Sequence, residues 1–280
     1  MSVRIITDST CDVSAEILPR LTVVPLTVHF GDTEYIDGVT ITKRQFYEKL
    51  IESDELPRTS QATPGAFGEV FARVAEAGDT AVVLTISEKL SGTYQSAVIA
   101  AEYYPGTIYV VDTKTACIGS GILAELALRL ADAGLSAEEI AGEITREREN
   151  VSVIAMLDTL EYLKKGGRIS KVTAFAGGIL SIKPVIRVRD GEIEILGKAR
   201  GSKQGNNLLV KEIEKTGGVD FSKPVLLGYS GLNDDLLQKY IADSRALWEE
   251  SPTPLQITDI SSAIGTHAGP GAIAVAFFHK

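Results

Sequence analysis

The chain has 280 residues, which suits two domains better than one, and 44% of them are hydrophobic, enough for a sizeable core. Its net charge of −9 argues against broad nucleic-acid binding, which requires a basic face. The two cysteines, Cys11 and Cys117, lie in no Cys/His cluster, so we expect a reducing compartment and no metal site. Neither a signal-peptide pattern nor an apolar run of about 18 residues occurs, which predicts a soluble, cytoplasmic protein.

Strand and helix patterns alternate through the first half of the chain. Residues 3–6 form a short apolar run that predicts a buried strand, and Ser14 is placed to cap a helix over residues 15–21. Residues 25–39 interrupt the alternation and predict a hairpin that turns near Gly31. We therefore expect a small inserted hairpin at about residues 25–40.

The following helices are marked by their capping residues. Thr42 and Gln45 have the spacing of a capping box. Ser136 and Glu139 repeat it, and Thr63 precedes a proline at the first helical position. Helical apolar spacing also covers residues 93–103 and 121–133, and buried strands are expected at residues 81–86, 108–111 and 153–157. Continuous β-branched runs are typical of parallel strands covered on both faces, so we predict a doubly wound parallel sheet.

After about residue 158 the pattern changes to hairpins mixed with helices. The pair Asp190-Gly191 is a two-residue turn signal between strands expected at residues 185–189 and 193–196. Further strands are expected at residues 223–229, 255–260 and 272–278, and helices at residues 160–163, 174–180 and 234–249. The prediction is an α/β chain with a parallel-sheet domain over residues 1–158 and an α+β domain over residues 159–280.

Two hydroxyl-rich loops are the strongest functional signal. They are residues 58–64 and 90–95, with hydroxyls that include those of Thr59, Ser60, Ser91 and Thr93. Hydroxyls and backbone N–H groups at a helix start hold an anion without reacting with it, and Gly92 lets a backbone N–H approach closely. Neither loop carries an acid, a base or a metal ligand, so the pattern favours binding of a small acidic group over catalysis.

Other charged residues follow predicted strand and helix ends. Asp8 and Asp12 suit a phosphotransferase or Mg²⁺ site, although turn capping is the simpler interpretation. Arg168 follows two glycines and, with Arg200, suits a phosphate or an acidic partner; the alternative is that it complements a helix end. His267 lies among three glycines and a proline, which predicts a constrained turn between two strands rather than a position on a helix.

Six short motifs in a fixed order resemble the DegV family. They occupy residues 7–12, 59–61, 90–94, 157–168, 182–184 and 265–271, and the resemblance spans nearly the whole chain. Ala62 departs from the proline that many members carry after the Thr-Ser-Gln segment. The resemblance implies a Rossmann-like N-terminal domain, an α/β C-terminal domain and a long-chain fatty acid buried between them.

The same resemblance implies roles for individual residues. Thr59 and Ser91 would hydrogen-bond the fatty acid carboxylate, and His267 would join them directly or through water. Arg168 and Arg200 would lie near the head group, linked with the phosphate or with a separate kinase protein. The same region is expected to contain Ser60, Gly92 and Thr93.

The implied activity is that of a substrate-presenting subunit without a cofactor. A separate kinase would phosphorylate the bound carboxylate, and the acyl phosphate would pass toward phospholipid synthesis, with transient membrane or acyltransferase contact. We expect apolar walls at residues 175–182 and 273–277, unless these are ordinary core. The alternative is a stand-alone phosphotransferase or hydrolase that uses Asp8, Asp12 or His267; the lack of a base–nucleophile pair and of a nucleotide-binding loop argues against it.

Overall fold

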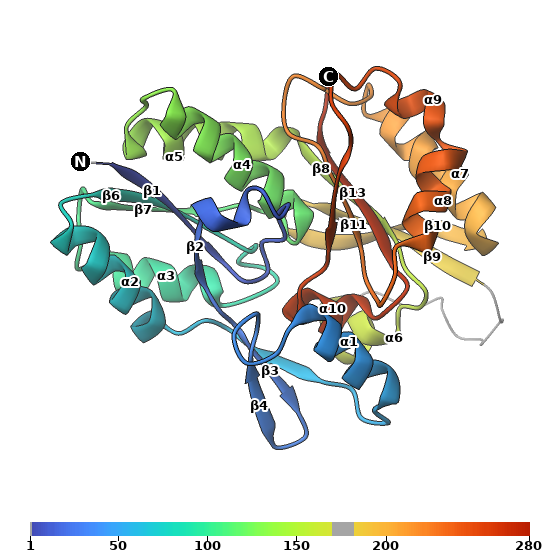
Figure 1. Ribbon diagram of the computed structural model, residues 1–280, viewed down its shortest axis with the longest axis horizontal. Helices are drawn as coiled ribbons and strands as arrows, with labels where there is room; N and C mark the ends of the chain where they lie inside the picture. The colour runs from blue at the N-terminus through green and yellow to red at the C-terminus, as the bar shows by residue number, and fades with distance from the viewer. Residues whose placement is uncertain (1, 170–181) are drawn as a thin grey trace.

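The computed structural model describes residues 2–169 and 182–280, which form two main sheets lying side by side (Figure 1). The first sheet has the strand order β2-β1-β6-β7, and all its strands are parallel. They are β1 (Val3–Asp8), β2 (Thr22–Val24), β6 (Thr80–Thr85) and β7 (Ile108–Asp112). One face is covered by α2 (Pro64–Glu76) and α3 (Thr93–Ala101), and the other by α4 (Ile118–Asp132) and α5 (Ala137–Glu147). The predicted doubly wound parallel sheet is confirmed.

Alternating side chains of this sheet fill two separate cores, because successive strand residues point to opposite faces. Ile6 packs with Phe67 of α2 in one core, and Leu84 packs with Ile122 of α4 in the other. Helix α4 contacts strands of both main sheets: β1 and β6 of the first, and β8, β11 and β13 of the second. It is therefore an inner wall common to the two halves of the molecule.

An inserted unit follows β2. Its strands β3 (Thr27–Phe30), β4 (Thr33–Ile36) and β5 (Arg58–Ser60) form an antiparallel sheet in the order β4-β3-β5, against which α1 (Lys43–Glu52) packs. The predicted hairpin is confirmed, and it turns at Gly31, whose φ of 56° suits glycine. Strand β5 was not predicted, because its three polar residues lack an apolar pattern. It carries Thr59.

The second main sheet has the order β10-β9-β8-β13-β11-β12. Its strands are β8 (Val151–Met156), β9 (Ile182–Arg189), β10 (Glu192–Arg200), β11 (Leu226–Tyr229), β12 (Gln256–Asp259) and β13 (Ile273–Phe278). The hairpin predicted at Asp190-Gly191 joins β9 to β10. The strand predicted at residues 153–157 was wrongly placed in the parallel sheet, since β8 pairs antiparallel with both β9 and β13. The apolar sequence of β8 looks like that of a parallel strand because β8 is also buried on both faces, between α4 and α7 (Gly201–Lys215).

The predicted side-chain caps are confirmed at three helix starts. The hydroxyls of Thr42, Thr63 and Ser136 accept backbone N–H groups as predicted, two of them in full capping boxes. The helix predicted over residues 15–21 was wrong: the segment holds only the short 3₁₀ turn η1 (Leu18–Arg20), since Pro19 lacks an N–H and cannot sit inside an α-helix. The helix predicted over residues 234–249 divides at Ser244 into α8 (Asp235–Asp243) and α9 (Arg245–Trp248).

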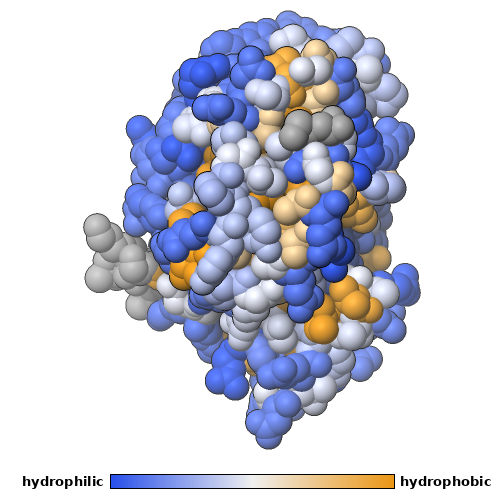
Figure 2. Space-filling model, turned by 90° about the vertical axis from the view of Figure 1, so that its left-hand side faces the viewer, coloured by the Kyte–Doolittle hydropathy of each residue, from blue (hydrophilic) through white to orange (hydrophobic). Residues whose placement is uncertain are grey.

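Two short helices complete the fold, α6 (Glu161–Lys165) and α10 (Ser262–Ala268), and a 3₁₀ turn, η2 (Arg148–Asn150), precedes β8. The helix predicted at residues 174–180 lies outside the described residues. Within the described ranges, no helix has both the length and the apolar character needed to cross a membrane. On the face drawn in Figure 2, hydrophilic residues predominate and hydrophobic residues form small, separate patches.

Candidate functional site

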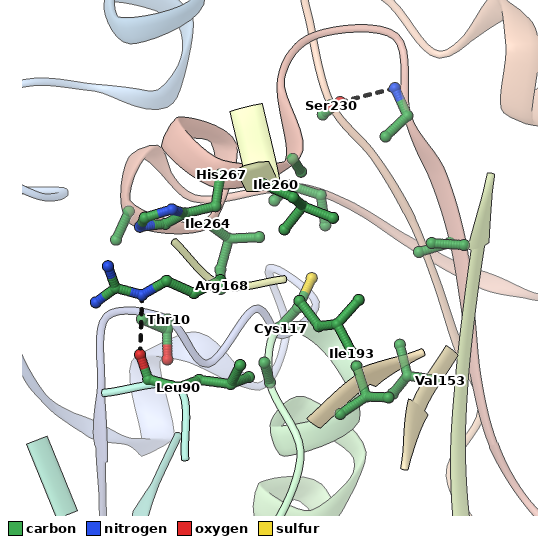
Figure 3. Close-up of a pocket in the computed structure, with 18 of the residues that line it drawn as sticks. Thr10, Leu90, Cys117, Val153, Arg168, Ile193, Ser230, Ile260, Ile264 and His267 are labelled. Carbon is green, nitrogen blue, oxygen red and sulfur yellow. Dashed lines mark hydrogen bonds between the residues drawn. The ribbon is translucent and has the colours of Figure 1, made fainter. Parts of the chain in front are cut away.

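An apolar cavity lies between the two main sheets (Figure 3). The space between its walls, open mouth included, is about 930 Å³. Its walls come from both halves of the chain and include Leu26, Leu90, Val153, Ala155, Ile186, Ile193, Ile264 and Ala274. Figure 3 shows Arg168 and His267 together on one side and Val153 and Ile193 on the opposite side. The cavity is therefore polar at one end and apolar at the other.

The polar end, called here the polar mouth, consists of Thr59, Ser91, Arg168 and His267. Thr59 Oγ1 lies 2.9 Å from His267 Nε2, which joins β5 to α10. Arg168 donates from Nε to the Leu90 carbonyl at 3.1 Å. An open groove on the protein surface shares Leu90, Ser91, Arg168 and Ile193 with the cavity. Ser91 and Arg168 belong to the polar mouth, so the cavity meets the surface there, and Ile193 extends the opening toward β10.

The His267 ring is held in a tight space. Its Nδ1 is buried and has no partner among the described residues. A Cβ added to Gly166 would lie 2.2 Å from that nitrogen, so glycine at this position lets the segment after α6 pack against the ring. Burial, helped by the Arg168 guanidinium, lowers the pKa of His267 to about 4. The ring is therefore neutral at pH 7, and the positive charge at the polar mouth comes from Arg168.

We expect this pKa to appear in the pH dependence of stability. The folded-state pKa of about 4 lies below the ordinary 6.5, so the unfolded chain takes up the proton first as the pH falls. The stability present above pH 6.5 is lost as the pH drops toward 4, by up to ~3 kcal/mol at about 1.4 kcal/mol per unit. Urea unfolding between these pH values should show a steeper loss for the native protein than for His267→Gln, and parallel curves would contradict this.

The two hydroxyl-rich loops meet, as the family resemblance implied. Ser91 Oγ lies 2.9 Å from Thr93 Oγ1 at the start of α3. Gln61 Nε2 donates to the carbonyl of Gly92 at 3.3 Å and to Ser96 Oγ at 2.9 Å. A Cβ on Gly92 would lie 2.1 Å from Gln61 Oε1, so with any other residue at this position the Gln61 side chain would have to move. Thr93 is fully buried behind Ser91 and does not line the cavity.

Two of the predicted site residues lie away from the cavity. Ser60 follows Thr59 on β5 and therefore points the other way, where its Oγ is 2.8 Å from His29 Nε2. Arg200 is exposed at the end of β10, and its backbone N–H donates to Gln204 Oε1. Neither belongs to the polar mouth, so a role for them concerns the surface rather than the cavity.

The two candidate catalytic carboxylates serve as internal hydrogen-bond acceptors. Asp8 accepts the backbone N–H groups of Thr10 at 2.9 Å and Ile86 at 2.8 Å. Asp12 accepts the N–H of Ser261 at 2.8 Å. Both are almost completely buried and outside the cavity lining, and burial raises the pKa of both, that of Asp12 to about 6.

His267 was predicted to lie in a turn between two strands, but it lies in the last turn of α10, and a turn follows only at Pro270-Gly271, before β13. The glycine count misled: Gly265 is inside the helix, where a Cβ would come within 2.6 Å of Tyr47 Oη, and Gly269 ends the helix with a φ of 72°. Of the wall predicted at residues 273–277, Ile273 and Ala274 line the cavity. Residues 175–181 of the other predicted wall lie outside the described part of the chain.

A family model described as "Uncharacterised protein, DegV family" matches residues 2–280. The chain belongs to the DegV family. A DegV domain-containing protein of Caldanaerobacter subterraneus subsp. tengcongensis is 34% identical over 281 residues, which cover 99% of both chains. The resemblance inferred from the sequence motifs is thus confirmed.

Solved structures of DegV proteins share the whole fold. A Thermus thermophilus DegV family protein, described by its fatty acid binding, is 33% identical, with a TM-score of 0.88 and full coverage of both chains. The Streptococcus pneumoniae fatty acid kinase B3 protein, loaded with linoleic acid, is 27% identical, with a TM-score of 0.85 and full coverage of both chains. The chain is therefore similar to fatty-acid-binding proteins over its entire length.

Proposed function

We propose that this protein binds a long-chain fatty acid with its tail in the cavity and its carboxylate at the polar mouth. The observation that carries the proposal is an apolar cavity with two hydroxyls, a neutral histidine and an arginine at the end that meets the surface. About 15 methylenes, at ~0.8 kcal/mol each, give on the order of 12 kcal/mol of burial energy. The polar mouth then needs only to orient the carboxylate through charge-assisted hydrogen bonds.

The finer proposal is that the chain presents this carboxylate to a separate kinase in the cytoplasm, and that the acyl phosphate then serves phospholipid synthesis. It is supported by the name of the pneumococcal relative, a fatty acid kinase B3 protein. Asp8 and Asp12 are engaged in internal hydrogen bonds, which argues against the alternative of a stand-alone phosphotransferase or hydrolase. Arg200 is exposed and is our candidate for contact with the kinase. Ser60 and Gly92 lie nearer the polar mouth and are candidates for the same contact.

Native mass spectrometry tests both levels of the proposal. Protein incubated with palmitic or oleic acid should gain the mass of one fatty acid, and addition of a fatty acid kinase with ATP should convert it to the acyl phosphate.

Arg200→Ala should leave fatty acid binding unchanged and slow the phosphorylation about 10- to 100-fold, the effect of losing one charge-assisted contact. The exposed Arg245→Ala on α9 is the control. A mass that no fatty acid shifts would refute binding; a normal phosphorylation rate would refute the role of Arg200.

A further inference from the structure

Helix α10 is held at its start by carboxylates from a distant part of the chain. Asp37 accepts two backbone N–H groups, from Ser262 to Oδ1 and from Ala263 to Oδ2, both at 3.2 Å. Asp12 accepts the N–H of Ser261 at 2.8 Å and its hydroxyl at 3.3 Å. These are the N–H groups that a helix start leaves without intrahelical partners.

The two carboxylates are themselves fixed in place. Both side chains are buried, with 2% of Asp12 and 3% of Asp37 exposed. Lys43 of α1 lies 3.6 Å from Asp12 and donates to the Asp259 carbonyl at 2.7 Å and to its carboxylate at 2.8 Å. The α10 clamp, as we call Asp12, Asp37, Lys43 and Asp259, therefore ties β1, the inserted unit and β12 to the same helix end.

The other end of α10 belongs to the cavity. Ala263, Ile264 and His267 line it, and His267 contributes to the polar mouth through its 2.9 Å contact with Thr59. A seven-residue helix moves as one body, so a shift at Ser262 is passed on to His267, about 7.5 Å further along at 1.5 Å per residue. The contact with Thr59 is a single hydrogen bond of 2.9 Å, so a shift of about 1 Å would break it.

We propose that Asp12 and Asp37 are positioning residues for the polar mouth: by holding the start of α10, they keep His267 within hydrogen-bond distance of Thr59. The effect on ligand retention rests on the proposed fatty acid function, whereas the effect on His267 does not. Residue 37 needs a carboxylate, because each of its two oxygens accepts one backbone N–H. An asparagine offers one acceptor and turns an N–H₂ toward the second donor.

The test uses Asp37→Asn and Asp12→Asn in the full-length protein, with Asp79→Asn as a matched control. Asp79 is also a buried carboxylate that accepts a backbone N–H, from Ser2 at 2.7 Å, but it is remote from the cavity lining. Histidine NMR in ligand-free protein measures the pKa of His267, and His267→Gln identifies its signals. We expect the His267 pKa to rise from about 4 toward 6.5 in Asp37→Asn and to stay unchanged in Asp79→Asn. The rise should be smaller in Asp12→Asn, because Asp12 has a pKa of about 6 and is itself protonated at the pH where His267 titrates.

Fatty acid release is the second readout. A fluorescent fatty acid should dissociate about tenfold faster from folded Asp37→Asn than from native protein, as expected for one lost charge-assisted hydrogen bond. Asp12→Asn, which keeps an acceptor for Ser261, should show a smaller change, and it remains informative if Asp37→Asn does not fold. An unchanged His267 pKa in the folded clamp variants, or an equal shift in Asp79→Asn, would overturn the proposal. Failure of native protein to bind any fatty acid would instead refute the proposed function.

Discussion

Replacing Ala155 by phenylalanine should abolish tight fatty acid binding while leaving the protein folded. Ala155 of β8 and Ala274 of β13 are directly paired across the second sheet, and both line the cavity. Their small side chains leave the floor of the cavity open, so a ring added there occupies space that the acyl tail would fill. If the ring displaces about five methylenes, at ~0.8 kcal/mol each, the loss is about 4 kcal/mol, close to 1,000-fold in affinity.

The measurement is displacement of a fluorescent fatty acid, together with urea unfolding of ligand-free protein. Ala274→Phe should give the same loss, since it fills the same space from the neighbouring strand. Ala75→Phe adds the same ring to an exposed position of α2 and should change neither quantity. Native-like affinity in both cavity variants would place the tail elsewhere and remove the main support for the proposed function.

The double variant Thr59→Ala, Ser91→Ala should lose affinity for a fatty acid by about 3–6 kcal/mol, because each hydroxyl bonded to a carboxylate contributes about 1.5–3 kcal/mol. The cavity stays intact in this variant, so the loss should concern the carboxylate alone. Binding of the corresponding long-chain alcohol should change much less. This comparison separates head-group recognition from tail burial.

Ser60→Ala is the matched control for that experiment. Ser60 is next to Thr59 on β5 but points away from the cavity, toward His29. Removing its hydroxyl should leave fatty acid affinity unchanged. Isothermal titration calorimetry measures the affinities of the native protein, the double variant and Ser60→Ala. If the double variant binds as tightly as native protein, Thr59 and Ser91 do not hold the carboxylate.

Features that depend on neighbours in sequence were predictable. The capping residues Thr42, Thr63 and Ser136 act within one helical turn, and the turn at Asp190-Gly191 needs only its own backbone. The meeting of the two hydroxyl-rich loops was implied only by the family resemblance, which assigned Thr59 and Ser91 to the same carboxylate.

Features that depend on distant parts of the chain were not predictable in the same way. The direction of β8 is set by its partners β9 and β13, and an apolar run carries no information about them. The glycines around His267 suggested a turn, and Gly269 and Gly271 do have positive φ values of 72° and 78° after the helix, but Gly265 lies inside α10 against Tyr47. The cavity walls combine small and branched residues from β8, β9, β10, α10 and β13, and in the sequence these look like ordinary core.

Helix α4 has one further consequence for how the molecule can be divided. It packs against β1 and β6 on one side and against β8, β11 and β13 on the other. A truncated chain that kept a single sheet would leave one flank of α4 bare, including buried leucines and isoleucines that now pack across the boundary. The two lobes are thus separate in topology but share one hydrophobic interior, and the cavity is a gap left in that shared interior.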